Sequence, residues 1–288
     1  AETLPNPALR VFPIKEVSDI GRKHNIPLIM DNTASPVICK PLDHGAAVVV
    51  HSLTKFIGGH GTVIGGCLVD GGNFDWTTDP KRQPLFNEPD ASYGGAVWGE
   101  VVPQLTGANV AFAVRARVCL LRDLGAPLAP DNAWGIIQGL ETAPLRMKQH
   151  CSNAEKVVDF LSKHKSVTRV IYPTLHKGAV GDRAKKYFKG GNGALVGIEV
   201  KGGVEAGKKF IEALKMFYHV ANIGDARSLA IHPATTTHSQ LTEEELLAAG
   251  VTPGYVRLSI GIEHPDDIIA DLEQALTASG KPGLKAVS

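Results

Sequence analysis

The sequence has few cysteines, and no two of them are closely spaced. Its 288 residues contain four, Cys39, Cys67, Cys119 and Cys151, and no C-x-x-C motif. This spacing argues against both a disulfide framework and a zinc ribbon. We therefore expect a reducing, cytoplasmic setting, in which Cys39 and Cys67 are small core residues.

The chain also lacks a strong net charge and a long apolar run. Its formal charge is +1 and its lysines and arginines form no block, so we expect no nucleic acid partner. No stretch reaches the length of a membrane span, so we expect no membrane partner. The chain opens without an initiator methionine, which is typical of a trimmed or partial sequence.

Short apolar runs alternate with helical patterns in the first part of the chain. Residues 13–25 have the spacing of an amphipathic helix with proline in its first turn. Uninterrupted apolar runs at 26–30 and 45–50 are typical of strands buried on both faces, and glycines bound a third strand within 65–72. This order predicts an α/β domain with a largely parallel sheet.

Residues 70–104 break this rhythm, because they are rich in glycine, proline, aspartate and aromatic residues. A long irregular segment inside a compact domain is usually functional or disordered, and its aromatic residues favour a packed loop. Three helices are predicted after it, over 110–125, 134–150 and 152–164. Gly125 would end the first of them, and Ser152 or Asn153 would begin the third.

Strand-like and helical stretches alternate again beyond residue 166. The strand-like stretches are 167–173, 194–200, 216–221 and 255–263, and the helical ones are 204–214 and 265–279. Strands interleaved with helices predict a second, smaller domain.

The stretch "VVHSLTKFIGGHGTVIGG", residues 49–66, places Lys55 at the end of an apolar run, with Ser52 and Thr54 beside it and glycines after it. Ligands of open α/β sheets bind outside the carboxyl ends of the strands. Asp31 ends the neighbouring run, so an acid and a lysine are expected to face one crevice. For an isolated aspartate and lysine, the alternative is a buried structural ion pair.

Nucleotide-binding motifs fail here on spacing. A G-x-x-x-x-G-K-[ST] loop needs its lysine after the glycines, and "GGHGTVIGG" does not supply G-x-G-x-x-G directly after a strand. Pyridoxal phosphate (PLP) instead requires an amine for a Schiff base, a carboxylate for its pyridine nitrogen and donors for its phosphate. Lys55, Asp31 and the hydroxyls of Ser52 and Thr54 match these three roles in type and order.

Five motifs follow one another along the chain: "IMDNTASP", "HSLTKFIGGHGTVIGG", "GLETAPLRM", "HPATTTHSQLT" and "VRLSIGIE". Through nearly its whole length the sequence resembles the Cys/Met-metabolism PLP enzymes, of the fold class that includes aspartate aminotransferase. The resemblance implies a type I PLP-dependent transferase fold, α/β, with a mostly parallel sheet in a large domain and a smaller C-terminal α/β domain. Residues 1–135 would be part of the large PLP-binding domain, without its N-terminal portion. Residues 136–288 would be the small domain with the connecting helix.

The resemblance also assigns roles at the cofactor. It implies that Lys55 is the Schiff-base lysine, that Asp31 is the partner of the pyridinium nitrogen, and that Ser52 and Thr54 are phosphate ligands. It places Asn6, of an "NP" motif, near the phenolic oxygen of the cofactor and near the substrate.

Two further residues are implied on the substrate side. Arg257 would bind the substrate α-carboxylate, and Asn222 stands where lyases and cystathionine synthases carry a serine near that carboxylate. From the residues alone, a charge between Val256 and Leu258 needs a partner, which is either structural or the substrate.

Within the family, segment 70–104 and "ANIGDARSLAIHPATTTHSQ" are similar to sulfhydrylases of O-acetylhomoserine. They imply γ-replacement of acetate by sulfide or a thiol, giving homocysteine for methionine and cysteine biosynthesis, in a homotetramer with sites at subunit interfaces. The chain would be roughly the C-terminal two-thirds of such an enzyme. The alternatives are O-succinylhomoserine sulfhydrylase, cystathionine γ-synthase, methionine γ-lyase or a non-catalytic partner chain.

Three histidines could suggest a metal site, but we predict none. His232, His238 and His264 come from separate segments without carboxylates at ligand spacing. We interpret them as surface or capping residues.

Overall fold

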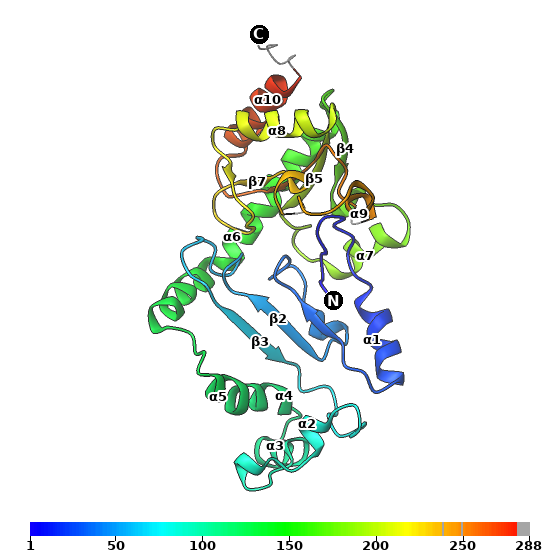
Figure 1. The fold of residues 1–288 in the computed structure, drawn as a ribbon, viewed down its shortest axis with the longest axis vertical. Helices are drawn as coiled ribbons and strands as arrows, with labels where there is room; N and C mark the ends of the chain where they lie inside the picture. The colour runs from blue at the N-terminus through cyan, green and yellow to red at the C-terminus, as the bar shows by residue number, and fades with distance from the viewer. Residues whose placement is uncertain (238, 249, 281–288) are drawn as a thin grey trace.

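The computed structural model describes residues 1–237, 239–248 and 250–280, and it contains two β-sheets joined by one long helix (Figure 1). The helices are α1 Ile14–Lys23, α2 Pro84–Asn87, α3 Trp98–Thr106, α4 Ala111–Arg115, α5 Arg122–Leu124, α6 Pro130–Lys163, α7 Ala179–Tyr187, α8 Gly203–Ala213, α9 Glu243–Ala248 and α10 Pro265–Ser279. The strands are β1 Ile29–Asp31, β2 Val48–Ser52, β3 Gly66–Asp70, β4 Val167–Ile171, β5 Leu195–Val200, β6 Tyr218–His219, β7 Leu229–Ile231 and β8 Tyr255–Ser259. Short turns are η1 Pro41–His44, η2 Ala91–Tyr93, η4 Pro173–Leu175 and η5 Pro233–Thr235, and η3 Ala116–Leu121 is π-helical.

The first sheet has the order β1-β2-β3. The strands β1 and β2 are parallel, with Asp31 opposite Val50, so both end at the same edge as predicted. The strand β3 runs antiparallel to β2, which makes this sheet mixed. The reason is the connection over residues 53–65, which contains no crossover helix and returns the chain directly beside β2.

An extended N-terminal segment pairs with the free edge of β1 and so widens this sheet. Residues 1–3 run parallel to β1, because the Asp31 N–H donates to the Ala1 carbonyl at 2.7 Å and the Thr3 N–H donates to the Asp31 carbonyl at 2.9 Å. This pairing carries the residues that follow, including Asn6, towards the carboxyl end of β1.

The second sheet has the order β4-β5-β8-β7-β6 and is antiparallel except between β6 and β7. Strands were predicted at β4, β5, β6 and β8, and each is found within the predicted range. The strand β7 was missed because it has only three residues. The helices α8 and α10 pack against each other, and α6 packs against α10, β4 and β5.

The helix α6 is continuous over 34 residues, so the predicted break at Ser152 or Asn153 is wrong. Asn153 is fully buried, and its side-chain amide donates to the carbonyls of Gly261 at 3.1 Å and Glu263 at 2.8 Å. A residue type that often caps helices thus bonds here to a distant loop. The helix runs from the first sheet to the second and connects them (Figure 1).

The aromatic residues of segment 70–104 pack together, as predicted. Phe74, Trp76 and Trp98 belong to a second hydrophobic cluster, separate from the main core. The Trp76 and Phe112 rings stack with their centroids 5.2 Å apart. The helical stretch predicted over 110–125 consists of α4, η3 and α5, and it ends at Gly125 with φ of 64° as predicted.

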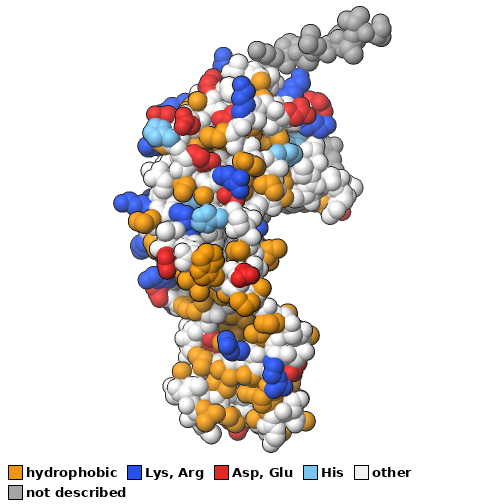
Figure 2. Space-filling model, turned by 90° about the vertical axis from the view of Figure 1, so that its left-hand side faces the viewer, with side chains coloured by type: hydrophobic (Ala, Val, Ile, Leu, Met, Phe, Trp, Pro, Cys, Tyr) orange, Lys and Arg blue, Asp and Glu red, His pale blue; other side chains and the backbone are white. Residues whose placement is uncertain are grey.

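Large hydrophobic side chains remain exposed around the first sheet, where they gather on one side of the molecule (Figure 2). On α6 and the helical turns before it they are Leu120, Leu121, Leu124, Trp134, Ile137, Leu140 and Leu145. Contiguous exposed apolar surface of this kind marks a contact surface in many proteins. Within the described residues, every helix is too short or too polar to cross a membrane.

Candidate active site

A cavity of about 260 Å³ opens at the carboxyl ends of β1 and β2. It is lined by Glu2, Leu4, Asn6, Asp31, Thr33, Ala34, Ser52, Lys55, Leu195, Ile223 and Arg257. Five of the predicted site residues are in this set, and they come from the N-terminal segment, both parallel strands, the turn after β2, and β8. Parallel pairing explains the adjacency of Asp31 and Ser52. The main-chain N–H of Ser52 also donates to the Thr33 hydroxyl at 2.8 Å.

Lys55 stands on the turn that follows β2. Its main-chain N–H donates to the Ser52 carbonyl at 3.2 Å, and its Nζ donates a hydrogen bond to Oδ1 of Asn222. Burial, and after it the nearby Arg257 guanidinium, lower the pKa of Lys55. A lower pKa increases the fraction of neutral amine, which is the form that acts as a nucleophile or base.

Asp31 and Lys55 line the cavity separately and do not form an ion pair with each other. Oδ1 of Asp31 accepts a hydrogen bond from the Thr33 N–H at 2.8 Å. Among the described residues, no ion pair involves Asp31 or Lys55. The alternative that Asp31 and Lys55 form a buried structural ion pair is therefore wrong.

Arg257 enters the cavity from the second sheet. It lies on β8, opposite Gly197 of β5 and Ile231 of β7, and its guanidinium donates to the main-chain carbonyl of Asn222 at 3.0 Å. Burial lowers the pKa of Arg257. No carboxylate of the described residues lies within ion-pair distance of it, so a largely buried cation faces the cavity with most of its donors unused.

Two predicted residues do not line the cavity. The Thr54 hydroxyl accepts from the Gly65 N–H at 3.1 Å and donates to the Gly65 carbonyl at 3.3 Å, which closes the loop between β2 and β3. Asn222 is outside the lining of the cavity, and its side-chain oxygen accepts a hydrogen bond from Lys55. The sequence analysis did not predict that Glu2 and Thr33 line the cavity, although both lie close to Asp31. Glu2 forms a parallel backbone bridge with Asp31, and Thr33 is two residues after it in "DNT".

The three histidines have different environments. His264 caps α10, since its Nδ1 accepts from the Asp266 N–H at 3.3 Å, as predicted. His232 stands at the N-cap position of η5, as the capping alternative expected, although its side chain makes no capping hydrogen bond. It is buried, with its ring nitrogens 2.8 Å from the Thr235 hydroxyl and 2.9 Å from the Pro253 carbonyl. His238 lies outside the described residues. Of the two predicted core cysteines, Cys39 is buried and Cys67 is half-buried.

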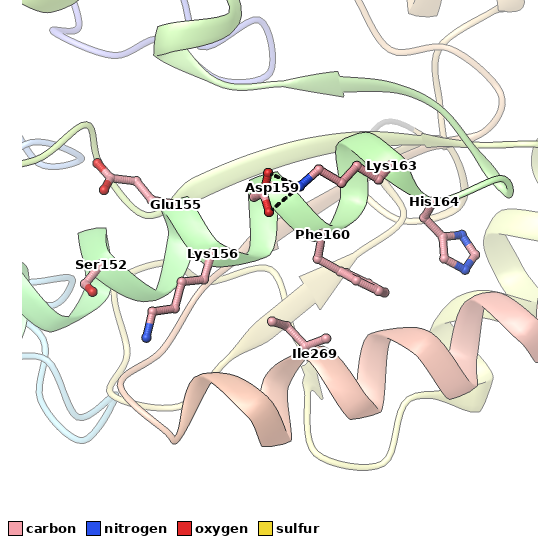
Figure 3. A pocket seen from close by; sticks show the side chains of 8 residues that line it. All are labelled: Ser152, Glu155, Lys156, Asp159, Phe160, Lys163, His164 and Ile269. Carbon is pink, nitrogen blue, oxygen red and sulfur yellow. Dashed lines mark hydrogen bonds and ion pairs between the residues drawn. The ribbon is translucent and has the colours of Figure 1, made fainter.

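A larger, more open groove of about 720 Å³ lies between α6 and α10 (Figure 3). Phe160 and Ile269 point towards each other across it, and an exposed ion pair joins Lys163 to Asp159 at 2.7 Å. None of the predicted site residues lines this groove. The smaller cavity is the better candidate, because it lies at strand ends and gathers groups with chemical function.

Comparison with known proteins identifies the family. The sequence matches the family described as "Cys/Met metabolism PLP-dependent enzyme" over residues 1–277. The chain belongs to this family. The predicted membership is thereby confirmed, and PLP is the cofactor of the family.

Relatives and solved structures agree with this assignment. The chain is 54% identical over 281 residues to an O-acetyl-L-homoserine sulfhydrylase of Leptospira meyeri, and 45% identical over 277 residues to a homocysteine synthase of Schizosaccharomyces pombe. Each match covers 96% of this chain and 63% of the relative, so the chain spans less than two-thirds of their length.

A crystal structure of a putative O-acetylhomoserine (thiol)-lyase from Campylobacter jejuni matches with a TM-score of 0.87 and 42% identity, over 96% of this chain and 65% of that one. That protein carries an N'-pyridoxyl-lysine-5'-monophosphate. The predicted α/β fold of type I is confirmed by these likenesses, with the antiparallel β3 as a detail that the sequence pattern did not indicate.

The groups in the cavity fit PLP in number and kind. A lysine amine of lowered pKa is present, together with a carboxylate at the end of the next strand. The Ser52 hydroxyl makes no hydrogen bond to the described residues, and one oxygen of Asp31 is likewise without a partner there. Unused donors and acceptors around one space are what a polar, anionic cofactor requires.

Proposed function

We propose that this chain is part of a PLP-dependent O-acetylhomoserine sulfhydrylase. The reaction replaces the acetate group on the γ-carbon of O-acetylhomoserine with sulfide and gives homocysteine and acetate. The observation that carries the proposal is the convergence of Lys55, Asp31 and the unpaired Arg257 on one cavity. The names of the two relatives supply the substrate class.

When bound, PLP supplies the electron sink that lets protons leave the α- and β-carbons of an amino acid. Lys55 would hold the cofactor and, once its Nζ is released, take the α-proton and then a β-proton. Its lowered pKa suits this role, because a base must be neutral to accept a proton. Asp31 would keep a proton on the pyridine nitrogen. Ser52 would donate to the phosphate, with Thr54 either assisting or shaping the loop.

Substrate binding would fall to the residues at the other wall of the cavity. A guanidinium binds a carboxylate through two parallel hydrogen bonds. Arg257 uses only one N–H group, towards the Asn222 carbonyl, in its hydrogen bonds to the described residues. Asn222, which contacts both Lys55 and Arg257, would keep the amine and the carboxylate site at a fixed separation. Asn6, exposed at the rim, would reach the cofactor and substrate from the N-terminal segment.

The complete protein would work as a homotetramer in the cytoplasm, with sites at subunit interfaces. The exposed apolar side chains on α6 and the turns before it support a contact surface there. We also propose the division into domains at residues 135 and 136, inside the helix that joins the two sheets. Light scattering on the complete protein should give the mass of four subunits. Trp134→Glu should lower that mass and Leu175→Glu, an exposed leucine outside this surface, should not, whereas a monomeric wild type would contradict the proposal.

Borohydride reduction of the PLP-loaded complete protein tests the lysine assignment. A pyridoxyl group should be fixed on the peptide that contains Lys55. Lys55→Ala should lose both the label and turnover, whereas Lys40→Ala, which changes an exposed lysine elsewhere, should keep both. A label on any other lysine would remove Lys55 from its role.

Steady-state assays with several substrates test the reaction. With sulfide as acceptor, kcat/KM should be higher for O-acetylhomoserine than for O-succinylhomoserine, and methionine should be cleaved slowly or not at all. Efficient release of methanethiol from methionine would favour a lyase. Preference for cysteine over sulfide as acceptor would favour a cystathionine synthase, and complete inactivity of a correctly labelled protein would favour a non-catalytic partner chain.

A further inference from the structure

The backbone that follows Lys55 lies directly against α6. A Cβ atom added to Gly139 would lie 2.3 Å from the Gly58 carbonyl oxygen and 2.7 Å from that of Ile57, so only glycine allows this approach. Gly59 has a φ of 75°, in the left-handed region that favours glycine. A Cβ atom on Gly59 would also meet the guanidinium of Arg146, a residue of α6, so glycine is needed on both sides of this contact.

One buried side chain of α6 binds this backbone. Arg146 is 6% exposed, and its guanidinium donates to the carbonyls of Phe56 and Ile57 at 2.7 Å each. It also donates to the Gly139 carbonyl at 2.7 Å, and its Nε donates to the Thr142 hydroxyl at 3.2 Å. A single side chain thus joins the two residues after Lys55 to the helix.

All of these partners are uncharged, which is unusual for a buried cation. No carboxylate of the described residues forms an ion pair with Arg146, and burial lowers the pKa of its guanidinium. A buried charge without a counter-ion is tolerated only when its hydrogen bonds are well made. Because the guanidinium is a rigid planar fork, it sets the spacing of the carbonyls that it binds. The arrangement therefore fixes the orientation of two successive peptide groups.

The loop that follows Lys55, residues 56–59, also makes contacts with uncharged groups. The Phe56 ring meets the His150 ring edge-on, with centroids 5.3 Å apart. The Gly59 carbonyl accepts from the Ala226 N–H at 2.8 Å. Among these described contacts, only Arg146 supplies a charge and several bonds at once.

We propose that Arg146 is a positioning residue, which aims Lys55 by clamping the Phe56 and Ile57 carbonyls against α6. This inference rests on the proposed role of Lys55 as the base of the reaction. It predicts that losing the clamp impairs the proton transfers more than substrate binding, because Arg257 reaches the cavity from the second sheet and keeps its own contacts. A displacement of about 1 Å of a catalytic group is enough to lower a rate about 100-fold.

The test compares Arg146→Ala, Arg146→Lys and Leu161→Ala in the complete, PLP-loaded protein. Leu161 is a fully buried residue of α6, 15 positions beyond Arg146, so its loss weakens the core without touching the loop. Borohydride labelling counts the loaded sites, and kcat is expressed per labelled site. Hydrogen exchange of the peptide over residues 53–60 is followed by mass spectrometry, which needs no substrate.

Arg146→Ala should lower kcat per labelled site by about 10- to 100-fold with KM changed less than about threefold, and exchange over residues 53–60 should accelerate. Arg146→Lys should recover only part of kcat, because an ammonium cannot bind two carbonyls at fixed spacing. Leu161→Ala should lower the melting temperature and leave kcat per site and loop exchange unchanged.

The proposal is overturned if Arg146→Ala keeps wild-type kcat per labelled site, or if Leu161→Ala loses as much at the same melting temperature. If Arg146→Ala does not fold, the same comparison made with Arg146→Lys decides. Failure of the sulfhydrylase proposal would show itself in the substrate assays or in the position of the label. Loop exchange and labelling would still test Arg146.

Discussion

The Lys55 amine donates a hydrogen bond to the side-chain oxygen of Asn222, 167 residues further along the chain. Lys55 lies on the turn after β2 of the first sheet, and Asn222 lies on the loop between β6 and β7 of the second sheet. The main-chain carbonyl of Asn222 also binds Arg257. The proposed catalytic amine and the proposed carboxylate site therefore share one residue. The loop of Asn222 sets their separation.

Removing the Asn222 amide should change how Lys55 titrates. The Asn222 oxygen stabilises the charged ammonium, so Asn222→Ala should lower the pKa of Lys55 further. The acidic limb of the kcat profile, which reports the amine after its release from the cofactor, should move to lower pH. Losing a hydrogen bond to a charged group costs about 1.5–3 kcal/mol, which corresponds to a fall of about 10- to 150-fold in kcat/KM. Asn192→Ala, which removes an exposed amide bonded to Glu155, is the matched control. An unshifted pH profile in Asn222→Ala would contradict the contact.

Arg257 should affect substrate binding without affecting the cofactor. Removing one partner of a desolvated charge pair costs about 2–5 kcal/mol, so Arg257→Ala should lower kcat/KM by about 30- to several thousand-fold. Arg257→Lys should recover only part of the loss. The control is Arg169→Ala, an exposed arginine on β4. A purely structural role predicts the reverse: a lower melting temperature with normal kinetics per loaded site.

Asp31→Asn should abolish turnover and keep the fold. The asparagine oxygen can still accept the hydrogen bond from the Thr33 N–H, so the local turn is preserved. The neutral amide no longer favours a proton on the pyridine nitrogen, so the cofactor loses its capacity to accept electrons. Kinetics, cofactor absorbance and melting temperature are compared with those of Asp43→Asn, an exposed control. Near-normal turnover of Asp31→Asn would mean that the acid is elsewhere.

The sequence predicted those parts of the site that depend on local pattern and parallel pairing. Asp31 and Ser52 end two apolar runs, and parallel strands bring such ends to one edge. The contact of Lys55 with Asn222 could not be predicted, because it depends on how the second sheet packs on the first. The direction of β3 and the continuity of α6 through Asn153 were also missed, since both depend on tertiary hydrogen bonds rather than on local preference.

The contacts of Arg146 also could not be predicted from the sequence. Its motif, "GLETAPLRM", supported the family resemblance, but the pattern gave no sign of which carbonyls the arginine would bind. An arginine on a helix face is usually solvated or paired with an acid. Only the fold reveals that it lies under the loop of Lys55.

The last prediction concerns pH and stability through His150, which is fully buried beside Phe56. Its Nδ1 donates to the Ile260 carbonyl at 2.7 Å, while its Nε2 has no partner among the described residues. Burial lowers the pKa of His150 from 6.5 to about 4. Protonation is therefore much less favourable in the folded chain than in the unfolded one.

The sign follows from proton uptake. Between pH 6.5 and about 4 the unfolded chain binds a proton at His150 that the folded chain does not, so the free energy of unfolding rises with pH over this window. The contribution of His150 is complete above pH 6.5 and is lost as the pH falls towards 4, with a total on the order of 3 kcal/mol. Urea unfolding of the complete protein at several pH values should show this slope. In His150→Asn, whose amide can keep the bond to Ile260, the slope should flatten, whereas His24→Asn, at an exposed position, should retain it. An equal slope in His150→Asn and wild type would assign the acid sensitivity to other groups.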